Sequence, residues 1–213
     1  TLEQPGALVG DPNACAGFGY GGIVVPYSAD LNPFTAFSLE AWAKIDPNAA
    51  GTDRPVLWSA NSSQGWAFGY SLSANASDTW AFTTGQKTSG FDTITGGSAA
   101  TEHWNHLVCT FDDATGDKRL YVNGELVAQT TTATGTFAPN PAEGTGDNPI
   151  PFDQGIGVNV RDATGYVGAL DEVAFYNYAL SPAQVEAHFA AGTGVVAAPT
   201  LTIAPSGSDL VIT

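Results

Sequence analysis

The sequence predicts an antiparallel β-protein with one short helix near its C-terminal end. The chain is rich in Gly, Thr, Ser and aromatic residues and poor in Lys, Arg and Glu, which favours strands and turns over long helices. Apolar and polar residues alternate over several short runs, as expected for strands with two unlike faces. Asn123 and Gly124 stand between two such runs and tolerate the positive φ of a type I′ turn, so residues 118–129 are predicted to form a β-hairpin.

The clearest alternation covers residues 37–45. One face holds Phe37, Leu39, Ala41, Ala43 and Ile45, and the other holds Ser38, Glu40, Trp42 and Lys44. Trp42 therefore lies opposite the apolar set, either covered by another segment or exposed for a ligand. Further aromatic residues are regularly spaced, which favours a place in the core over an exposed surface for stacking on sugars. They are Trp66, Phe68, Tyr70, Trp80 and Phe82.

One segment reads as a helix. Ser181 is a suitable N-cap, Pro182 suits the first helical position, and Gln184 stands three residues after the cap. Val185 and Phe189 are four residues apart and can face the core together. Gly192 can end the helix.

The domain organisation is predicted as one large domain over residues 1–196, followed by a linker and the truncated start of a second β-domain, or a spare strand pair, over residues 197–213. Residues 131–152 are rich in Pro and Gly and read as a long loop. No apolar run reaches about 18 residues, so we expect no membrane insertion. Because the chain contains no Met, it is expected to be a mature or excised piece of a longer protein.

The net charge of the chain limits the classes of partner that it can bind. The chain has 6 basic and 21 acidic residues, for a net charge of −15. This excludes a basic footprint for nucleic acid and argues against an anionic membrane surface. The excess of acid suits a calcium-containing medium, or it serves solubility alone.

The two cysteines, Cys15 and Cys109, are too few for a disulfide framework. They are either two unlinked, buried thiols or, in a secreted protein, one bridge that closes a long loop. No CxxC spacing supports a metal site at this pair.

Four blocks carry a resemblance to a known family. They are "GGIVVPYSADLN", "AFSLEAWAKID", "EHWNHLVCTFDDATGDKRLYVNGELVAQ" and "IGVNVRDATGYVGALDEVAFYNYALSPAQV", and they span most of residues 13–190. In order and spacing they resemble the laminin G-like, concanavalin A-like jelly-roll domains of many secreted proteins. The resemblance implies a two-sheet antiparallel jelly-roll sandwich. That fold hosts lectins, receptor modules, glycan-binding modules and glycosidases alike.

Asp171 and Glu172 are the first candidate site residues. In a regular strand they point to opposite faces, so they cannot act as a glycosidase pair across one cleft. Asp171 would share its face with Val173 and Phe175, and a buried carboxylate needs hydrogen bonds or a cation.

The resemblance implies a structural calcium ion held by Asp171 and by backbone near Gly22, with Asp11 as a further ligand. The alternative is that Asp171 accepts backbone N–H bonds.

Other catalytic patterns are absent from the sequence. No E-x-D-x-x-E spacing and no G-x-S-x-G motif occurs. His103 and His106 lie three apart in a predicted strand and so face opposite ways, and the resemblance implies a structural role for His106.

We therefore expect a non-catalytic module, rather than an enzyme, that binds carbohydrate or a glycosylated surface. It would belong to a larger secreted, extracellular bacterial protein and contact neighbouring domains of that chain. The alternatives are a polysaccharide-degrading enzyme with an unusual site and a purely structural or adhesion spacer.

Overall fold

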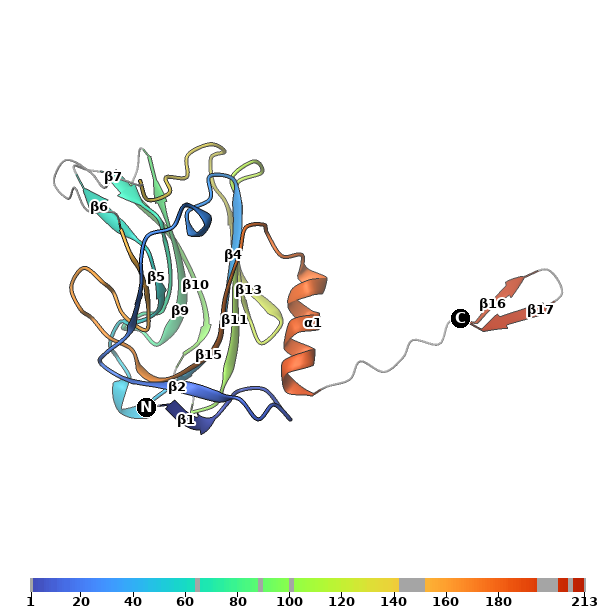
Figure 1. Ribbon diagram of the computed structural model, residues 1–213. Helices are drawn as coiled ribbons and strands as arrows, with labels where there is room; N and C mark the ends of the chain where they lie inside the picture. Colours follow the sequence, from blue (N-terminus) through green and yellow to red (C-terminus); the bar gives the residue numbers. More distant parts are fainter. Residues whose placement is uncertain are drawn as a thin grey trace.

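Two antiparallel sheets face one another as the layers of a sandwich, and one helix lies outside them (Figure 1). The structure is a computed structural model that describes residues 2–63, 66–87, 90–99, 102–141, 152–194, 203–206 and 209–212. The predicted fold class, a jelly-roll sandwich with a single short helix, is confirmed.

The larger sheet has seven strands in the order β1-β2-β15-β4-β11-β12-β13. In chain order these are β1 (Leu2–Pro5), β2 (Ala14–Gly19), β4 (Ala36–Ile45), β11 (Asn105–Asp112), β12 (Asp117–Val122), β13 (Glu125–Thr131) and β15 (Val167–Tyr176). The smaller sheet has six strands in the order β10-β9-β8-β5-β14-β3. These are β3 (Ile23–Val25), β5 (Arg54–Trp58), β8 (Tyr70–Ala74), β9 (Thr79–Gln86), β10 (Gly90–Ser98) and β14 (Gln154–Ile156).

Shorter elements complete the fold. Two 3-10 turns, η1 (Ala29–Leu31) and η2 (Pro47–Ala49), flank β4. Two strand pairs lie outside the main sheets: β6 (Asn61–Ser63) with β7 (Trp66–Phe68), and β16 (Ile203–Ser206) with β17 (Asp209–Ile212). The predicted linker from residue 197 to 202 lies outside the described residues, so the proposed division of the chain stays a prediction.

The core lies between the inner faces of the two sheets. The predicted apolar face of β4 is confirmed, because Phe37 and Leu39 are fully buried. The ring of Phe37 lies 4.8 Å from that of Tyr70 on the opposite sheet and 5.7 Å from that of Phe111 on the neighbouring strand. Burying each such side chain contributes about 1.5–3 kcal/mol.

The Asn-Gly hairpin is confirmed as well. Asn123 and Gly124 have φ values of 54° and 80°, and they connect β12 to β13. In the predicted long loop, the described part packs against the sandwich, since Phe137 and Asn140 are buried. Residues 142–151 lie outside the described part of the chain.

The prediction that Trp66 belongs to the core is wrong. Tyr70, Trp80 and Phe82 are buried as predicted, but Trp66 is 48% exposed. Its segment is two strands, because Gly69 has φ +70° and separates β7 from β8. A Cβ at Gly69 would lie 2.1 Å from the backbone oxygen of Ser59, so only glycine fits there.

The helix α1 (Pro182–Thr193) begins where the sequence predicts, with a capping box between Ser181 and Gln184. Its predicted end is wrong: the left-handed cap is Gly194, and Gly192 lies inside the helix. A Cβ at Gly192 would lie 2.4 Å from the Trp42 ring. Gly192 therefore lets α1 lie directly on the outer face of β4.

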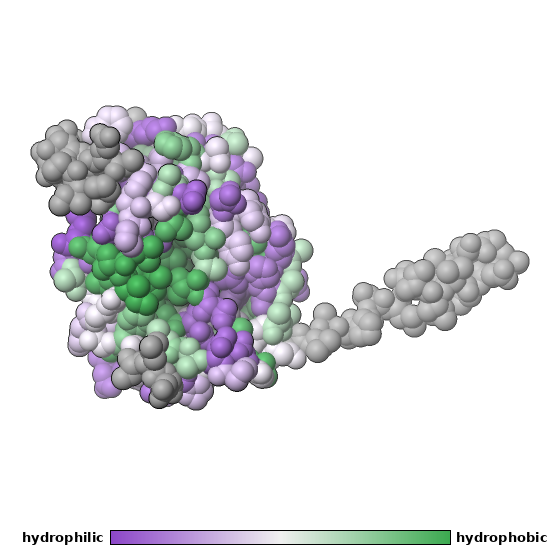
Figure 2. Space-filling model, viewed as in Figure 1, coloured by the Kyte–Doolittle hydropathy of each residue, from purple (hydrophilic) through white to green (hydrophobic). Residues whose placement is uncertain are grey.

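Exposed hydrophobic residues are concentrated on one side of the sandwich. Figure 2 shows hydrophobic residues gathered on the side of the sandwich away from α1. On the edge strand β3, Ile23 and Val24 are 50% and 54% exposed. Within the described residues no helix is long and apolar enough to cross a membrane.

Lys118 is a buried cation between the sheets. Its ammonium donates to Thr84 Oγ1 (3.1 Å) and to Asp92 Oδ2 (3.2 Å), and it lies 4.9 Å from the centre of the Phe82 ring. Burial lowers the pKa of Lys118 to about 8, although Asp92 opposes this shift.

This pKa predicts a pH dependence of stability. Between the folded pKa of about 8 and the unfolded value, the unfolded chain binds more protons, so the contribution of Lys118 to stability rises with pH. We expect the free energy of unfolding of the wild type, relative to Lys118→Met, to increase by roughly 2–3 kcal/mol from pH 7 to pH 10. Urea unfolding at each pH measures it, and a constant difference would contradict it.

Candidate functional site

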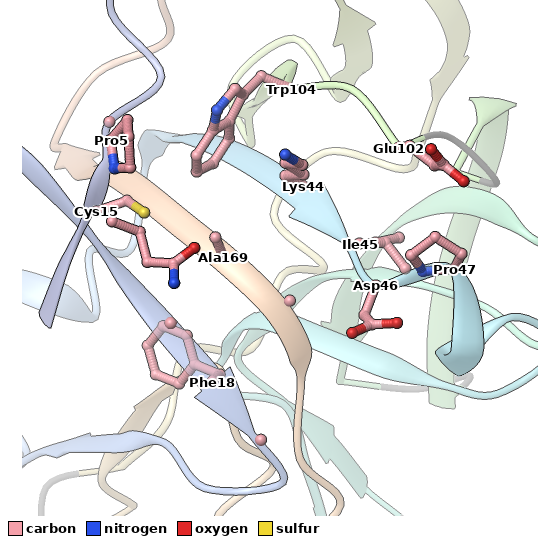
Figure 3. A pocket seen from close by; sticks show the side chains of 15 residues that line it. Pro5, Cys15, Phe18, Lys44, Ile45, Asp46, Pro47, Glu102, Trp104 and Ala169 are labelled. Carbon is pink, nitrogen blue, oxygen red and sulfur yellow. The ribbon is translucent and has the colours of Figure 1, made fainter. Parts of the chain in front are cut away.

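An open groove of about 790 Å³ lies on the outer face of the seven-stranded sheet (Figure 3). Its floor crosses three strands, because Lys44 pairs with Ala169 and Ala169 pairs with Gly17. The next residues along β4 and β15, Ile45 and Leu170, point into the core. Lys44 and Ala169 therefore point outward, away from the sandwich interior.

Small residues make the floor low. Gly17, Gly19, Gly168 and Ala169 line the groove, so little side-chain volume rises from β2 and β15. Gly168 has φ +141°, and a Cβ there would lie 2.2 Å from the backbone oxygen of Lys44. The same outer face is covered by α1 only two residues further along β4, at Trp42.

One wall is the N-terminal strand β1 with the residues that follow it, Gln4 to Gly6. The backbone N–H of Ala7 donates to Asp171 Oδ2 at 2.8 Å and so holds this segment against β15. A Cβ at Gly6 would lie 2.7 Å from the same carboxylate oxygen. Asp171 thus fixes the position of the wall.

Aromatic and charged side chains complete the lining of the groove. Figure 3 shows the Trp104 indole and the Lys44 ammonium above Ala169, with Glu102 and Asp46 to one side. Trp104 is half buried, and Lys44 and Glu102 are exposed. Asp46 Oδ1 accepts hydrogen bonds from the Asn48 backbone N–H and side-chain amide (2.9 and 2.8 Å), so this carboxylate caps η2.

The structure corrects the predicted geometry of Asp171 and Glu172. A bulge interrupts the pairing of β15 with β4 between Asp171 and Ala174, and Glu172 has φ +47°. The extra residue exchanges the faces, so Asp171 does not share a face with core residues but stands opposite Trp42 on the outer side. Burial raises the pKa of Glu172, and the carboxylates of Asp171 and Asp11 raise it further.

The predicted calcium ligands are not brought together. Asp171 and Asp11 both lie close enough to Glu172 to raise its pKa, but Gly22 packs on Val158, beyond the far end of β2. At about 3.3 Å per residue along β2, Gly22 is roughly 10 Å or more from Asp171, too far to share a calcium shell.

The hydrogen bonds of Asp171 also differ from those of a calcium ligand. Its Oδ2 accepts from Ala7, and its Oδ1 accepts from the backbone N–H of Glu172 at 3.1 Å. No cluster of His, Cys, Asp and Glu suited to a metal occurs among the described residues. The calcium ion therefore stays a prediction, and the hydrogen bonds that Asp171 accepts are those of the alternative, a carboxylate that accepts backbone N–H groups.

The cysteines are free and buried. Cys15 lies on β2 and Cys109 on β11, and β15 and β4 separate these strands in the sheet. With strands about 4.8 Å apart, the two thiols are too distant for the bridge that was one alternative. Cys15 lies in the groove lining, and burial raises its pKa.

A polar cluster under α1 resembles a catalytic arrangement in composition. Glu40 Oε1 lies 2.6 Å from His106 Nε2, Tyr176 donates to Glu40 Oε2 at 2.7 Å, and His188 Nδ1 lies 3.0 Å from the same oxygen. The cluster fills the contact between helix and sheet and does not line the groove. The cluster links α1 to β4, and His106 is fully buried in it, which fits the structural role that the resemblance implies.

Sequence reasoning missed the groove residues Trp104, Lys44 and Glu102. Lys44 was recognised only as part of a polar face, and Trp104 only as part of a family block. Their importance depends on the order β2-β15-β4, which brings together residues far apart in the chain. The small residues Gly17, Gly19, Gly168 and Ala169, in two separate segments, are the feature of the sequence that could have indicated a low floor.

Comparison with known proteins agrees with the fold. Residues 18–186 match the family model Laminin_G_3, described as the concanavalin A-like lectin/glucanases superfamily. This match confirms the resemblance stated from the sequence. No curated protein matches the chain.

Several solved structures are similar in fold, at low sequence identity. The Ruminococcus gnavus IT-sialidase CBM40 has a TM-score of 0.61 and 14% identity, covering 82% of this chain and 96% of that chain. The binding domain of Paraclostridial Mosquitocidal Protein 1 has a TM-score of 0.61 and 15% identity, covering 89% and 47%.

A botulinum neurotoxin type C structure, whose title reports interaction with two ganglioside molecules, has a TM-score of 0.57 and 12% identity, covering 79% and 39%. The chain therefore spans less than half of the toxin chains it matches.

Asp171→Ala tests the role of this carboxylate. We expect a loss of about 1–3 kcal/mol in the free energy of unfolding, because the partly buried N–H of Ala7 loses its acceptor. The loss should be equal in calcium chloride and in chelator, measured by urea unfolding. A loss that appears only in calcium would show that a calcium ion is bound at Asp171.

Glu40→Gln tests the contact between helix and sheet. Burial alone would raise the pKa of Glu40, but hydrogen bonds from His106 and Tyr176 lower it below the ordinary 4.5. Its stabilisation is therefore present above pH 4.5 and lost as the pH falls through the lower folded value. We expect the variant to be less stable by about 1–3 kcal/mol at pH 7, with the difference shrinking towards pH 3 in urea titrations.

Proposed function

The chain belongs to the concanavalin A-like lectin/glucanases superfamily, and from this premise we propose that it is a carbohydrate-binding module whose sugar lies in the groove beside Trp104. The premise supplies the ligand class, since domains of similar fold include a sialidase CBM40 and toxin binding domains. The groove supplies a place for the ligand on this chain.

The geometry of the groove is the observation that carries the proposal. A pyranose ring is a chair whose axial C–H groups give it an apolar face, with hydroxyls around its edge. The low floor at Gly17 and Ala169 leaves room for such a ring, and the Trp104 indole offers an apolar surface for its face. Its volume of about 790 Å³ lies within the usual range for small-molecule sites.

Polar groups stand where the hydroxyls of such a ring would lie. The Lys44 ammonium donates, the Glu102 carboxylate accepts, and the Gln4 amide does both. Few rotatable groups must be ordered on binding, because backbone hydrogen bonds fix both the floor and the β1 wall.

The proposed action is binding without catalysis. Of the two carboxylates at the groove, Asp46 is committed to capping η2, and Glu102 stands on an exposed loop. A hydrolase needs one acid and one base facing a common bond. The polar cluster at Glu40 lies under α1 instead.

We place the module outside the cell, within a larger bacterial protein and next to other domains. The support is the acidic composition, with a net charge of −15, and the resemblance to domains of secreted proteins. Calcium has no part in the proposed binding.

Trp104→Ala tests the groove. We expect the affinity for a bound oligosaccharide to fall about tenfold or more, equivalent to ~1.4 kcal/mol, because the stacking surface is lost. Glycan-array screening identifies the oligosaccharide, and titration calorimetry measures the change. Phe34→Ala is the matched control, because Phe34 is an aromatic residue 74% exposed outside the groove lining. Equal affinities of wild type and Trp104→Ala would refute the site.

A further inference from the structure

We propose that the protein has a second sugar-binding surface, on the outer face of the six-stranded sheet, that takes a neutral polysaccharide. Its residues are Trp66 on β7, Phe91 on β10 and the threonines Thr83, Thr93 and Thr95, and we name it the aromatic platform. It lies on the opposite sheet from the groove and does not depend on it (Figure 1).

The hairpin β6–β7 is seated on the outer face of β9. Thr84 and Gln86 are buried, so Gly85 between them faces outward. A Cβ at Gly85 would lie 2.5 Å from the Cα of Phe68, so glycine is required where the hairpin touches the sheet. The Gly85 N–H donates to the Gly69 oxygen at 2.7 Å.

Alternation along β7 decides what the hairpin presents to solvent. Ala67 is 1% exposed and faces the sheet, so Trp66 and Phe68 face away from it. Their rings are nearly parallel, with centroids 6.5 Å apart and planes 9° apart. The hairpin is also held from its other side, because Arg161 donates to the Ser62 oxygen at 2.8 Å.

A second exposed aromatic residue stands beside the hairpin. Phe91 is the cross-strand partner of Gly85 and is 43% exposed. The backbone of Phe68 packs on the same Gly85. The hairpin lies over Gly85, and β7 and β10 are in contact. Trp66 and Phe91 are therefore exposed aromatic side chains on two neighbouring elements of the same outer face.

Hydroxyl groups continue the same outer face. Thr93 pairs with Thr83, and their Oγ1 atoms are hydrogen-bonded at 2.8 Å. Thr95 lies two residues further along β10 on the same face, and both Thr93 and Thr95 are exposed. An apolar stacking surface thus leads into a row of neutral donors and acceptors.

The chemistry of this surface selects a neutral sugar. Asp92, between Phe91 and Thr93, turns inward to Lys118, so its charge is withdrawn from the face. Nearby Lys87 donates to the Gly135 oxygen at 3.0 Å. With a net charge of −15 on the whole chain, an anionic polysaccharide is repelled, whereas a neutral one meets rings for stacking and hydroxyls for hydrogen bonding.

The test removes each site separately and measures retardation in native gels containing a neutral polysaccharide. Laminarin, mannan and xylan are the neutral probes, and alginate is the anionic one. In a Trp104→Ala background the groove is disabled, so remaining retardation reports the platform. We expect at least one neutral probe, and not alginate, to retard Trp104→Ala. Adding Trp66→Ala and Phe91→Ala should weaken this interaction about tenfold or more.

Conservative and control variants separate binding from folding. Trp66→Tyr should restore most of the retardation, whereas Phe34→Ala should leave it unchanged. Because Trp66 and Phe91 are exposed, the thermal unfolding midpoints of their variants should stay near that of the Trp104→Ala parent.

Three results would overturn the platform: no neutral probe retards Trp104→Ala, the platform variants migrate as their parent does, or sedimentation shows a dimer that Trp66→Ala dissociates. The groove proposal is judged independently, by the loss of oligosaccharide binding in Trp104→Ala while Trp66→Ala retains it.

Discussion

The apolar layer between the two sheets uses up their inner faces, and this constraint decides where the protein can bind anything. Phe37 is in contact with rings from both sheets, and the neighbouring inner residues Leu39, Ala41 and Leu72 are fully buried. Two cationic side chains that enter this layer are paired with carboxylates. Lys118 is bound to Asp92, and the Arg54 guanidinium lies 2.6 Å from Asp78. The filled layer therefore leaves no room for a ligand between the sheets.

Glycine determines how those outer faces are divided. Gly192 lets α1 lie on Trp42, Gly85 lets the hairpin β6–β7 lie on β9, and Gly6 lets the N-terminal segment pass Asp171. In each case a Cβ would collide with the neighbouring segment. Where small residues meet without a covering segment, as at Gly17 and Ala169, the groove is left instead. A glycine on an outer face thus either allows another segment to pack over the sheet or, where no segment packs there, forms part of the groove.

Features decided by a few consecutive residues could be predicted from the sequence. Asn123-Gly124 forms its turn because of its own φ preferences, Ser181 caps α1 locally, and the alternation of β4 shows its inner face. Features decided by strand pairing could not. The bulge at Glu172 exchanges the faces of β15, and this reversed the expected surroundings of Asp171.

The same limit applies to the candidate site. Trp66 was assigned to the core because nothing in the spacing shows that Gly69 breaks the strand. The groove joins β2, β15 and β4, and its residues come from positions 4 to 169 of the chain. Only the finished sheet order brings Lys44 next to Ala169 and Gly17. The proposed ligand class came from the family resemblance, but the proposed place of binding required the structure.

The placement of the groove and the platform has a consequence for how the module would hold a polysaccharide. The groove and the platform lie on opposite outer faces, with the core between them, so one short oligosaccharide cannot occupy both. Two chains of an assembled polysaccharide can, because each face then meets its own chain. Once the first face is bound, the second binds at a high effective concentration, and the combined strength exceeds that of either contact. A module of this kind would hold weakly to soluble fragments and firmly to a polymer network.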